Sequence, residues 1–137
     1  MKQYNKLSKD LLNKLELILD KNFIFTNNEV LNEYSRDETE NLSYPPEVLL
    51  KPGTSFEVSK IMKFAFEHNI PVTPIGARTG LSGGALSIHG GIGLSMERFN
   101  KIINIDEDNL QLVVEPGVIT QVLQEEVAKK GLYYAPD

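Results

Sequence analysis

Clustering of glycine in one short stretch is the feature that most constrains the fold. Seven of the ten glycines lie between Gly76 and Gly93. Glycine reaches backbone conformations closed to other residues and lets other groups approach the main chain closely, at a cost in chain entropy. Such a loop is either shaped around a bound group or is a glycine-rich hairpin or bulge needed only for its own backbone geometry.

A strand–helix–strand pattern precedes the glycines. Residues 47–51 (EVLLK) predict a short buried strand. Thr54 and Glu57 have the spacing of a capping box, and an apolar stripe with helical period follows them. Residues 71–75 (PVTPI) predict a second strand. Two strands joined by a helix run parallel, so a small parallel sheet is expected.

The remaining segments predict an α+β fold. Residues 92–96, 102–105 and 111–115 are expected to be strands, the later ones mostly antiparallel, and residues 120–130 a helix that ends with Gly131 at the C′ position. Ahead of these, apolar positions from Ser8 to Asp20 repeat with helical spacing, and residues 27–39 predict a weak helix followed by a loop. We therefore divide the chain into an N-terminal helical segment, 1–43, and a domain at 44–137.

Composition narrows the function classes. With 14 basic and 19 acidic residues the net charge is −5, which disfavours a nucleic-acid partner. The absence of cysteine excludes disulfides, thiolate metal sites and cysteine nucleophiles in these residues, and no histidine lies at metal-ligand spacing from the acids. No apolar run is long enough to span a membrane, and the N-terminus lacks the apolar core of a signal peptide, so we expect a cytoplasmic protein.

The glycine-rich loop has the chemistry of an anion site. Backbone N–H groups fanned around a concavity bind anions. Residues 68–96 contain no Asp or Glu, and their only permanent cation is Arg78. Thr79 and Ser82 add hydroxyl donors. Neither a Walker motif nor Gly-x-Gly-x-x-Gly occurs, which argues against simple nucleotide triphosphatase and Rossmann folds.

The stretch 74–85 (PIGARTGLSGGA) resembles the pyrophosphate-binding loop of flavoproteins of the vanillyl-alcohol oxidase, or PCMH, type. It is similar in particular to the FAD-binding subunit of glycolate oxidase and to D-lactate and D-2-hydroxyglutarate dehydrogenases. The similarity extends in order over about residues 28–137, through Pro45-Pro46-Glu47-Val48, residues 98–102 (RFNKI), residues 114–118 (VEPGV) and the terminal residues 132–137 (LYYAPD).

The resemblance implies a PCMH-type FAD-binding domain in which main-chain amides of the loop hold the diphosphate of FAD. The implied cofactor contacts are Gly76, Ala77, Arg78, Thr79, Gly80, Leu81, Ser82 and Gly83, together with Pro136 and Asp137 at the start of a further flavin-contacting stretch. Pro116-Gly117 matches a tight turn near the cofactor, for which a purely structural role is an equal alternative.

Two loop positions depart from the family pattern. Arg78 stands where the family often has glycine, so it either pairs with a phosphate or points to solvent, and a backbone angle that only glycine adopts would be strained there. Thr79 stands where some relatives carry a histidine bonded covalently to the flavin. We therefore expect non-covalent FAD.

The resemblance also implies an activity. Family members are several hundred residues long and carry their catalytic side chains beyond the region matched here, so we expect an N-terminal part of a dehydrogenase or oxidase acting on glycolate- or D-lactate-like 2-hydroxy acids, inactive and free of FAD by itself. No catalytic residue is assigned. Two alternatives stay open: a stand-alone nucleotide- or anion-binding module, and a split interaction subunit completed by another chain. The electron acceptor is unassigned, and homodimer or partner subunit are both open.

Other side chains are given structural roles. His68 and His89 are expected on the surface or in turns rather than in acid–base catalysis. Tyr133 and Tyr134 could stack on a ring, but core packing is the commoner use of paired aromatics.

Overall fold

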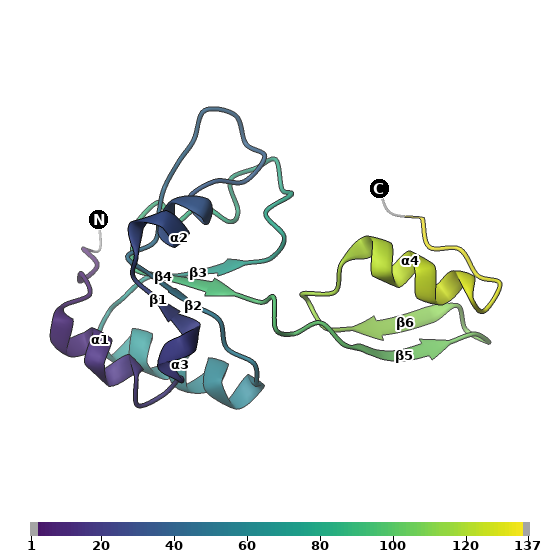
Figure 1. The fold of residues 1–137 in the computed structure, drawn as a ribbon, viewed down its shortest axis with the longest axis horizontal. Helices are drawn as coiled ribbons and strands as arrows, with labels where there is room; N and C mark the ends of the chain where they lie inside the picture. The colour runs from purple at the N-terminus through teal and green to yellow at the C-terminus, as the bar shows by residue number, and fades with distance from the viewer. Residues whose placement is uncertain (1–2, 136–137) are drawn as a thin grey trace.

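A four-stranded sheet forms the centre of the larger of two lobes (Figure 1). The computed structural model describes residues 3–135. The strands β1 (Ile24–Phe25), β2 (Val48–Leu50), β3 (Val72–Ile75) and β4 (Ile92–Ser95) lie in the order β1-β2-β4-β3. β4 pairs in parallel with both β2 and β3, whereas β1 pairs with β2 in the antiparallel direction. The strand–helix–strand unit predicted from the sequence is confirmed, with β4 inserted between its two strands.

Helices cover both faces of this sheet. Alternate residues of β2 point to opposite faces, so Val48 and Leu50 join one apolar cluster and Leu49 joins the other. The first cluster contains residues of α1 (Lys9–Leu15) and α3 (Ser55–Glu67). The second is built around α2 (Asn28–Glu33), which lies on the opposite side of the sheet from α3 (Figure 1). β2 and β4 are buried along their whole length because both faces are covered.

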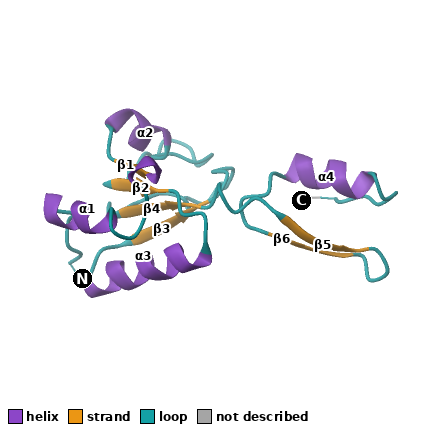
Figure 2. Ribbon diagram, turned by 60° about the horizontal axis from the view of Figure 1, so that its bottom comes forward, coloured by secondary structure: helices purple, strands orange, loops and turns teal. Residues whose placement is uncertain are grey.

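A helix over a two-stranded sheet forms the second, smaller lobe (Figure 2). The strands β5 (Ile102–Asp106) and β6 (Gln111–Val114) are antiparallel and carry a register shift between Ile102 and Asn104. Helix α4 (Thr120–Ala128) buries Leu123 and Val127. Ile103 and Val113 remain 63% and 52% exposed, so part of the apolar surface of this small sheet is uncovered.

The boundaries differ from the sequence expectations in three places. The regular part of α1 ends at Leu15, and the chain continues in turns to Leu19, whose side chain is buried in the core. A single 3₁₀ turn, η1 (Lys21–Phe23), leads into the unpredicted strand β1, which is too short for a sequence pattern to reveal. Gly131 has φ +72° and lies two residues beyond the C-cap Lys129, rather than next to it as predicted.

None of the helices between residues 3 and 135 combines the length and apolar character that crossing a membrane requires.

The predicted capping box at the start of α3 is present and can be tested. The Thr54 hydroxyl accepts the Glu57 amide at 3.2 Å, and the Glu57 carboxylate accepts the amides of Thr54 and Gly53 at 3.1 and 2.7 Å. Thr54→Ala should lower the free energy of unfolding by about 1 kcal/mol, because the first turn loses its cap. Urea denaturation measures this change. Thr120→Ala, at an exposed first helical position of α4, is the matched control and should change little; equal effects of the two variants would contradict the prediction.

Candidate functional site

Three chain segments meet at the carboxyl edge of the parallel sheet. Lys51 directly follows β2, Gly76 directly follows β3, and Glu97 lies two residues beyond β4. Because β2, β4 and β3 run in the same direction, their carboxyl ends share one edge. This edge is the usual ligand-binding position of parallel sheets.

The glycine-rich loop leaves this edge without regular structure. Residues 76–91 form bends and turns and belong to no helix or strand. Among residues 3–135, no protein group accepts a hydrogen bond from the backbone amides of residues 76–82. Backbone donors usually find a partner. This run of free amides therefore has the donor chemistry of an anion cradle.

Three glycines of this loop, Gly76, Gly80 and Gly84, are not required by packing within the chain. A Cβ added at Gly76, Gly80 or Gly84 would meet no atom within 4 Å, and none of the three has a positive φ. Gly117 is different, because a Cβ there would overlap the carbonyl oxygens of Met96 and Phe99. The three open positions keep the main chain bare towards space that a ligand can fill.

A cavity of about 430 Å³ lies beside the start of the loop. Its lining comes from both lobes: Gly76, Ala77, Arg78, Glu97 and Asn100 on one side, and Pro116, Gly117, Val118, Ile119 and Val122 before and within α4 on the other. The Gly117 amide donates to the Phe99 carbonyl at 2.7 Å, which holds the turn before α4 against the connection between the lobes. The cavity thus has a polar side at the sheet edge and an apolar side at α4.

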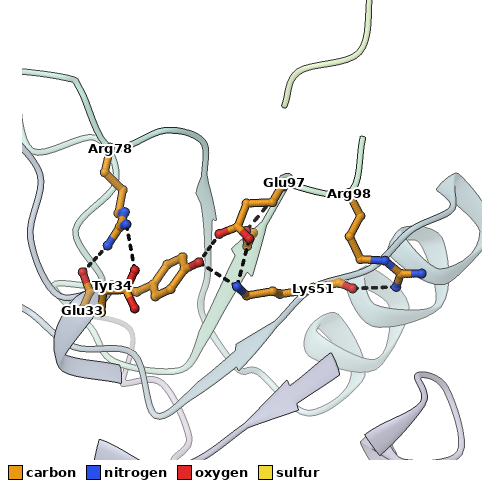
Figure 3. Close-up of polar contacts among 7 residues, drawn as sticks. Glu33, Tyr34, Lys51, Arg78, Glu97 and Arg98 are labelled. Atoms are coloured by element: carbon orange, nitrogen blue, oxygen red, sulfur yellow. Dashed lines mark hydrogen bonds and ion pairs between the residues drawn. The ribbon is translucent and has the colours of Figure 1, made fainter. Parts of the chain in front are cut away.

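A hydrogen-bonded cluster of Tyr34, Lys51 and Glu97 stands at the same edge (Figure 3). The Lys51 ammonium donates to the Tyr34 hydroxyl at 2.8 Å and to the Glu97 carboxylate at 2.9 Å, and the Tyr34 hydroxyl donates to the other Glu97 oxygen. Tyr34 is only 3% exposed although it comes from the polar segment after α2. The cluster therefore joins that segment to the ends of β2 and β4.

These contacts set the charge states of the cluster. Burial raises the pKa of Tyr34, and the neighbouring Glu97 carboxylate raises it further, which outweighs the lowering effect of Lys51. Burial acts to raise the pKa of Glu97, but the hydrogen bonds from Tyr34 and Lys51 hold that pKa below its ordinary value. Burial acts to lower the pKa of Lys51, and its hydrogen bonds to Tyr34 and Glu97 keep it raised. At neutral pH the cluster is a neutral phenol with an ammonium–carboxylate pair.

Arg98 fastens the ends of β2 and β4 together. Its guanidinium donates to the Lys51 carbonyl at 2.9 Å (Figure 3). It also lies 3.6 Å from the centre of the Phe23 ring. A side chain at Gly53 would collide with this guanidinium, since a Cβ there would lie 2.6 Å from it. The absence of a side chain at Gly53 thus makes room for Arg98.

Arg78 is held by Glu33 and Tyr34, two residues that the sequence did not indicate as its partners. Its φ is +62°, a conformation that costs a non-glycine residue about 1–3 kcal/mol, as expected of a position suited to glycine. Its guanidinium donates to the backbone carbonyl of Glu33 and, at 3.2 Å, to the Glu33 carboxylate. It also lies over the Tyr34 ring, 4.3 Å from the ring centre. The side chain therefore points to the end of α2.

Residues 46–137 match the FAD binding domain family. The chain belongs to this family. Over 136 residues it is 38% identical to a D-lactate dehydrogenase of Anaerostipes hadrus, a match that covers 98% of this chain and 28% of that protein. It is 39% identical over 104 residues to the glycolate oxidase subunit GlcD of Bacillus subtilis, covering 76% of this chain and 22% of that protein. The chain thus spans about a quarter of the length of these curated relatives.

The fold agrees with this assignment. The structure of p-cresol methylhydroxylase with substrate bound superposes with a TM-score of 0.77 at 25% identity, covering 90% of this chain and 25% of the other. The predicted PCMH-type α+β fold is confirmed, and the family's cofactor is FAD. The free amides, the bare glycine positions and the adjoining cavity fit a dinucleotide diphosphate.

The residues predicted to contact FAD fall into three groups in the structure. Gly76, Ala77 and Arg78 line the cavity. Thr79, Gly80, Leu81 and Ser82 continue the free-amide run. The Gly83 amide is already used, because it donates to the Thr39 hydroxyl at 2.8 Å. Pro136 and Asp137 lie outside the described residues.

The remaining aromatic candidates are away from the cavity lining. His68 packs edge-on against Phe64, with ring centres 4.7 Å apart, and His89 lies 5.2 Å from the ring of Tyr4. The prediction that Tyr133 packs in the core is wrong, because its side chain is 84% exposed.

Sequence reasoning missed the Tyr34, Lys51, Glu97 cluster. Lys51 and Glu97 carried a usable signal, since Lys51 ends one predicted strand and Glu97 follows another, and the carboxyl ends of both strands belong to the expected ligand edge. Tyr34 carried none, because a single aromatic in a polar segment does not indicate which strand it packs against.

The Glu97 contacts predict an acid-dependent stability. Because its pKa is lowered on folding from the ordinary value of 4.5, its contribution is present above that value and is lost as pH falls through the lowered native pKa. The urea midpoint of the wild type should therefore drop more between neutral and acidic pH than that of Glu97→Gln. Glu107→Gln, which alters an exposed ion pair to Lys130, serves as control. Parallel pH profiles for wild type and Glu97→Gln would contradict the prediction.

Proposed function

We propose that this chain anchors FAD in a flavin-dependent dehydrogenase or oxidase of 2-hydroxy acids, with residues 44–137 forming the FAD-binding part and residues 1–43 a helical segment packed against it. The observation that carries the proposal is the run of free amides at 76–82 beside glycines that the chain itself does not require. Relatives named D-lactate dehydrogenase and glycolate oxidase subunit support the substrate class.

The chain's own residues have a binding and orienting role in this proposal. The amides of residues 76–82 hold the diphosphate, with the Thr79 and Ser82 hydroxyls as further donors. Residues 116–119 provide the apolar wall of the adjoining cavity. Thr79 offers no nucleophilic nitrogen for a covalent link, so FAD is held non-covalently. Bound FAD supplies the redox chemistry, by accepting a hydride from the α-carbon of the 2-hydroxy acid.

The activity is tested on the natural protein that contains these residues. It should be yellow when purified, and anaerobic addition of D-lactate or glycolate should remove the visible flavin absorption, because the substrate hydride reduces the flavin. The matching L-lactate and a 2-oxo acid serve as controls for stereochemistry and for the redox requirement. A colourless protein that still binds inorganic pyrophosphate at the loop would favour the alternative of a stand-alone anion-binding module.

The loop assignment is tested by Gly80→Val. A Cβ at this position would meet no atom of the chain within 4 Å, so we expect folding to be preserved, and we expect the valine side chain to occupy the space in front of the free amides. We expect FAD affinity to fall by at least about a hundredfold, equivalent to the loss of two to three hydrogen bonds. Flavin fluorescence titration measures the affinity.

Ser59→Val adds a branched side chain on the exposed surface of α3 and is the matched control. Circular dichroism establishes that both variants fold. A Gly80→Val protein that retains a full complement of FAD would refute the loop assignment.

A further inference from the structure

Three contacts tie the glycine-rich loop to residues 33–39, which comprise the last residue of α2 and the segment after it. The Arg78 guanidinium donates to Glu33, the Glu38 amide donates to the Gly80 carbonyl at 3.1 Å, and the Gly83 amide donates to the Thr39 hydroxyl at 2.8 Å. Two of these contacts use the main chain of the loop itself. The direction in which the intervening amides point is therefore set by a segment outside the loop.

Arg78 makes the strongest of these ties. Its guanidinium is paired with Glu33 and stacked on the Tyr34 ring, and the side chain is 26% exposed. A planar guanidinium can stack and donate in two directions at once, which an ammonium cannot. The residue keeps this arrangement with a backbone angle of +62°, where glycine would be free of strain.

Tyr34 is itself fixed, so the contact is rigid on both sides. Its hydroxyl is bound by Lys51 and Glu97, and the Lys51 ammonium lies 4.9 Å from the ring centre. Lys51 and Glu97 extend from the ends of β2 and β4. Figure 3 shows the resulting row from Arg78 through Tyr34 to Glu97 and Lys51. Arg78 is thereby connected, through Tyr34, to the ends of β2 and β4.

We propose that Arg78 is a positioning residue: by clamping the loop onto Tyr34 and Glu33, it holds the amides of residues 78–82 in the orientation that binds the FAD diphosphate, without contacting the diphosphate itself. This inference rests on the proposed function. It assigns a role in cofactor binding to the segment after α2, which lies outside the region 46–137 that matches the FAD binding domain family.

A double-mutant cycle on FAD affinity tests the clamp in the natural protein. Arg78→Lys keeps the charge but loses the planar stack, and should weaken FAD binding by about tenfold, the size of one stacked charged contact. Tyr34→Leu removes the ring and should weaken binding to a similar degree. In the Tyr34→Leu background, Arg78→Lys should have almost no further effect, because the two residues act as a unit.

Arg36→Lys is the matched control, since Arg36 is exposed on the same segment and makes no hydrogen bond or ion pair within residues 3–135. It should leave FAD affinity unchanged. Hydrogen exchange in FAD-free protein gives a readout independent of the cofactor and of Tyr34→Leu folding, at the two hydrogen-bonded amides that join the loop to residues 33–39. Arg78→Lys should speed exchange at the Glu38 and Gly83 amides, which donate to the Gly80 carbonyl and the Thr39 hydroxyl, and Arg36→Lys should not.

Three results would overturn the proposal. An equal effect of Arg78→Lys in wild-type and Tyr34→Leu backgrounds would mean that Arg78 acts directly on the diphosphate. A lower melting temperature with unchanged FAD affinity would mean a merely structural contact, as would unchanged amide exchange in Arg78→Lys. If the wild type binds no FAD, the proposed function fails and this inference fails with it. If the wild type binds FAD and Gly80→Val does not, the proposed function stands, and the double-mutant cycle of Arg78 and Tyr34 tests this inference separately.

Discussion

Parallel pairing of β4 with both β2 and β3 is the constraint on which the site depends. It brings Lys51, the start of the glycine-rich loop and Glu97 to one edge, although they are far apart in the sequence. The pairing is secured by burial on both faces, since β2 and β4 have no exposed residue. Covering both faces needs helices on both sides, and α2 on the second side delivers Tyr34 and Glu33 to the loop. The same two-sided packing of helices on the sheet therefore buries the core and brings these residues to the candidate site.

Local signals in the sequence were sufficient for much of this arrangement. The capping box of Thr54 and Glu57 placed the start of α3 correctly, and short apolar runs located β2, β3 and β4 to within a residue. The glycine-rich loop was predicted because it combines many glycines with an absence of acids, and both properties are readable without a partner. These predictions required only neighbours in the chain.

The unpredicted features all depend on residues distant in sequence. β1 has two residues and exists because Ile24 and Phe25 reach the free edge of β2. The contacts of Arg78 with Glu33 and Tyr34 were not predicted, because nothing near Arg78 in the sequence indicates them. Glu33 is 45 residues away from Arg78 in the chain. Gly117 appeared as an ordinary turn glycine, whereas its necessity arises from the carbonyls of Met96 and Phe99. Contacts between residues distant in the sequence produce no periodic pattern from which they could be predicted.

The small lobe has a consequence for handling the chain. Its sheet has only two strands among the described residues, so both outer edges present main-chain donors and acceptors, and Ile103 and Val113 add apolar surface beside them. Backbone edges next to exposed apolar side chains are the combination through which sheets of separate molecules join. We therefore expect this chain, when studied by itself, to self-associate as its concentration rises and to remain monomeric only in dilute solution.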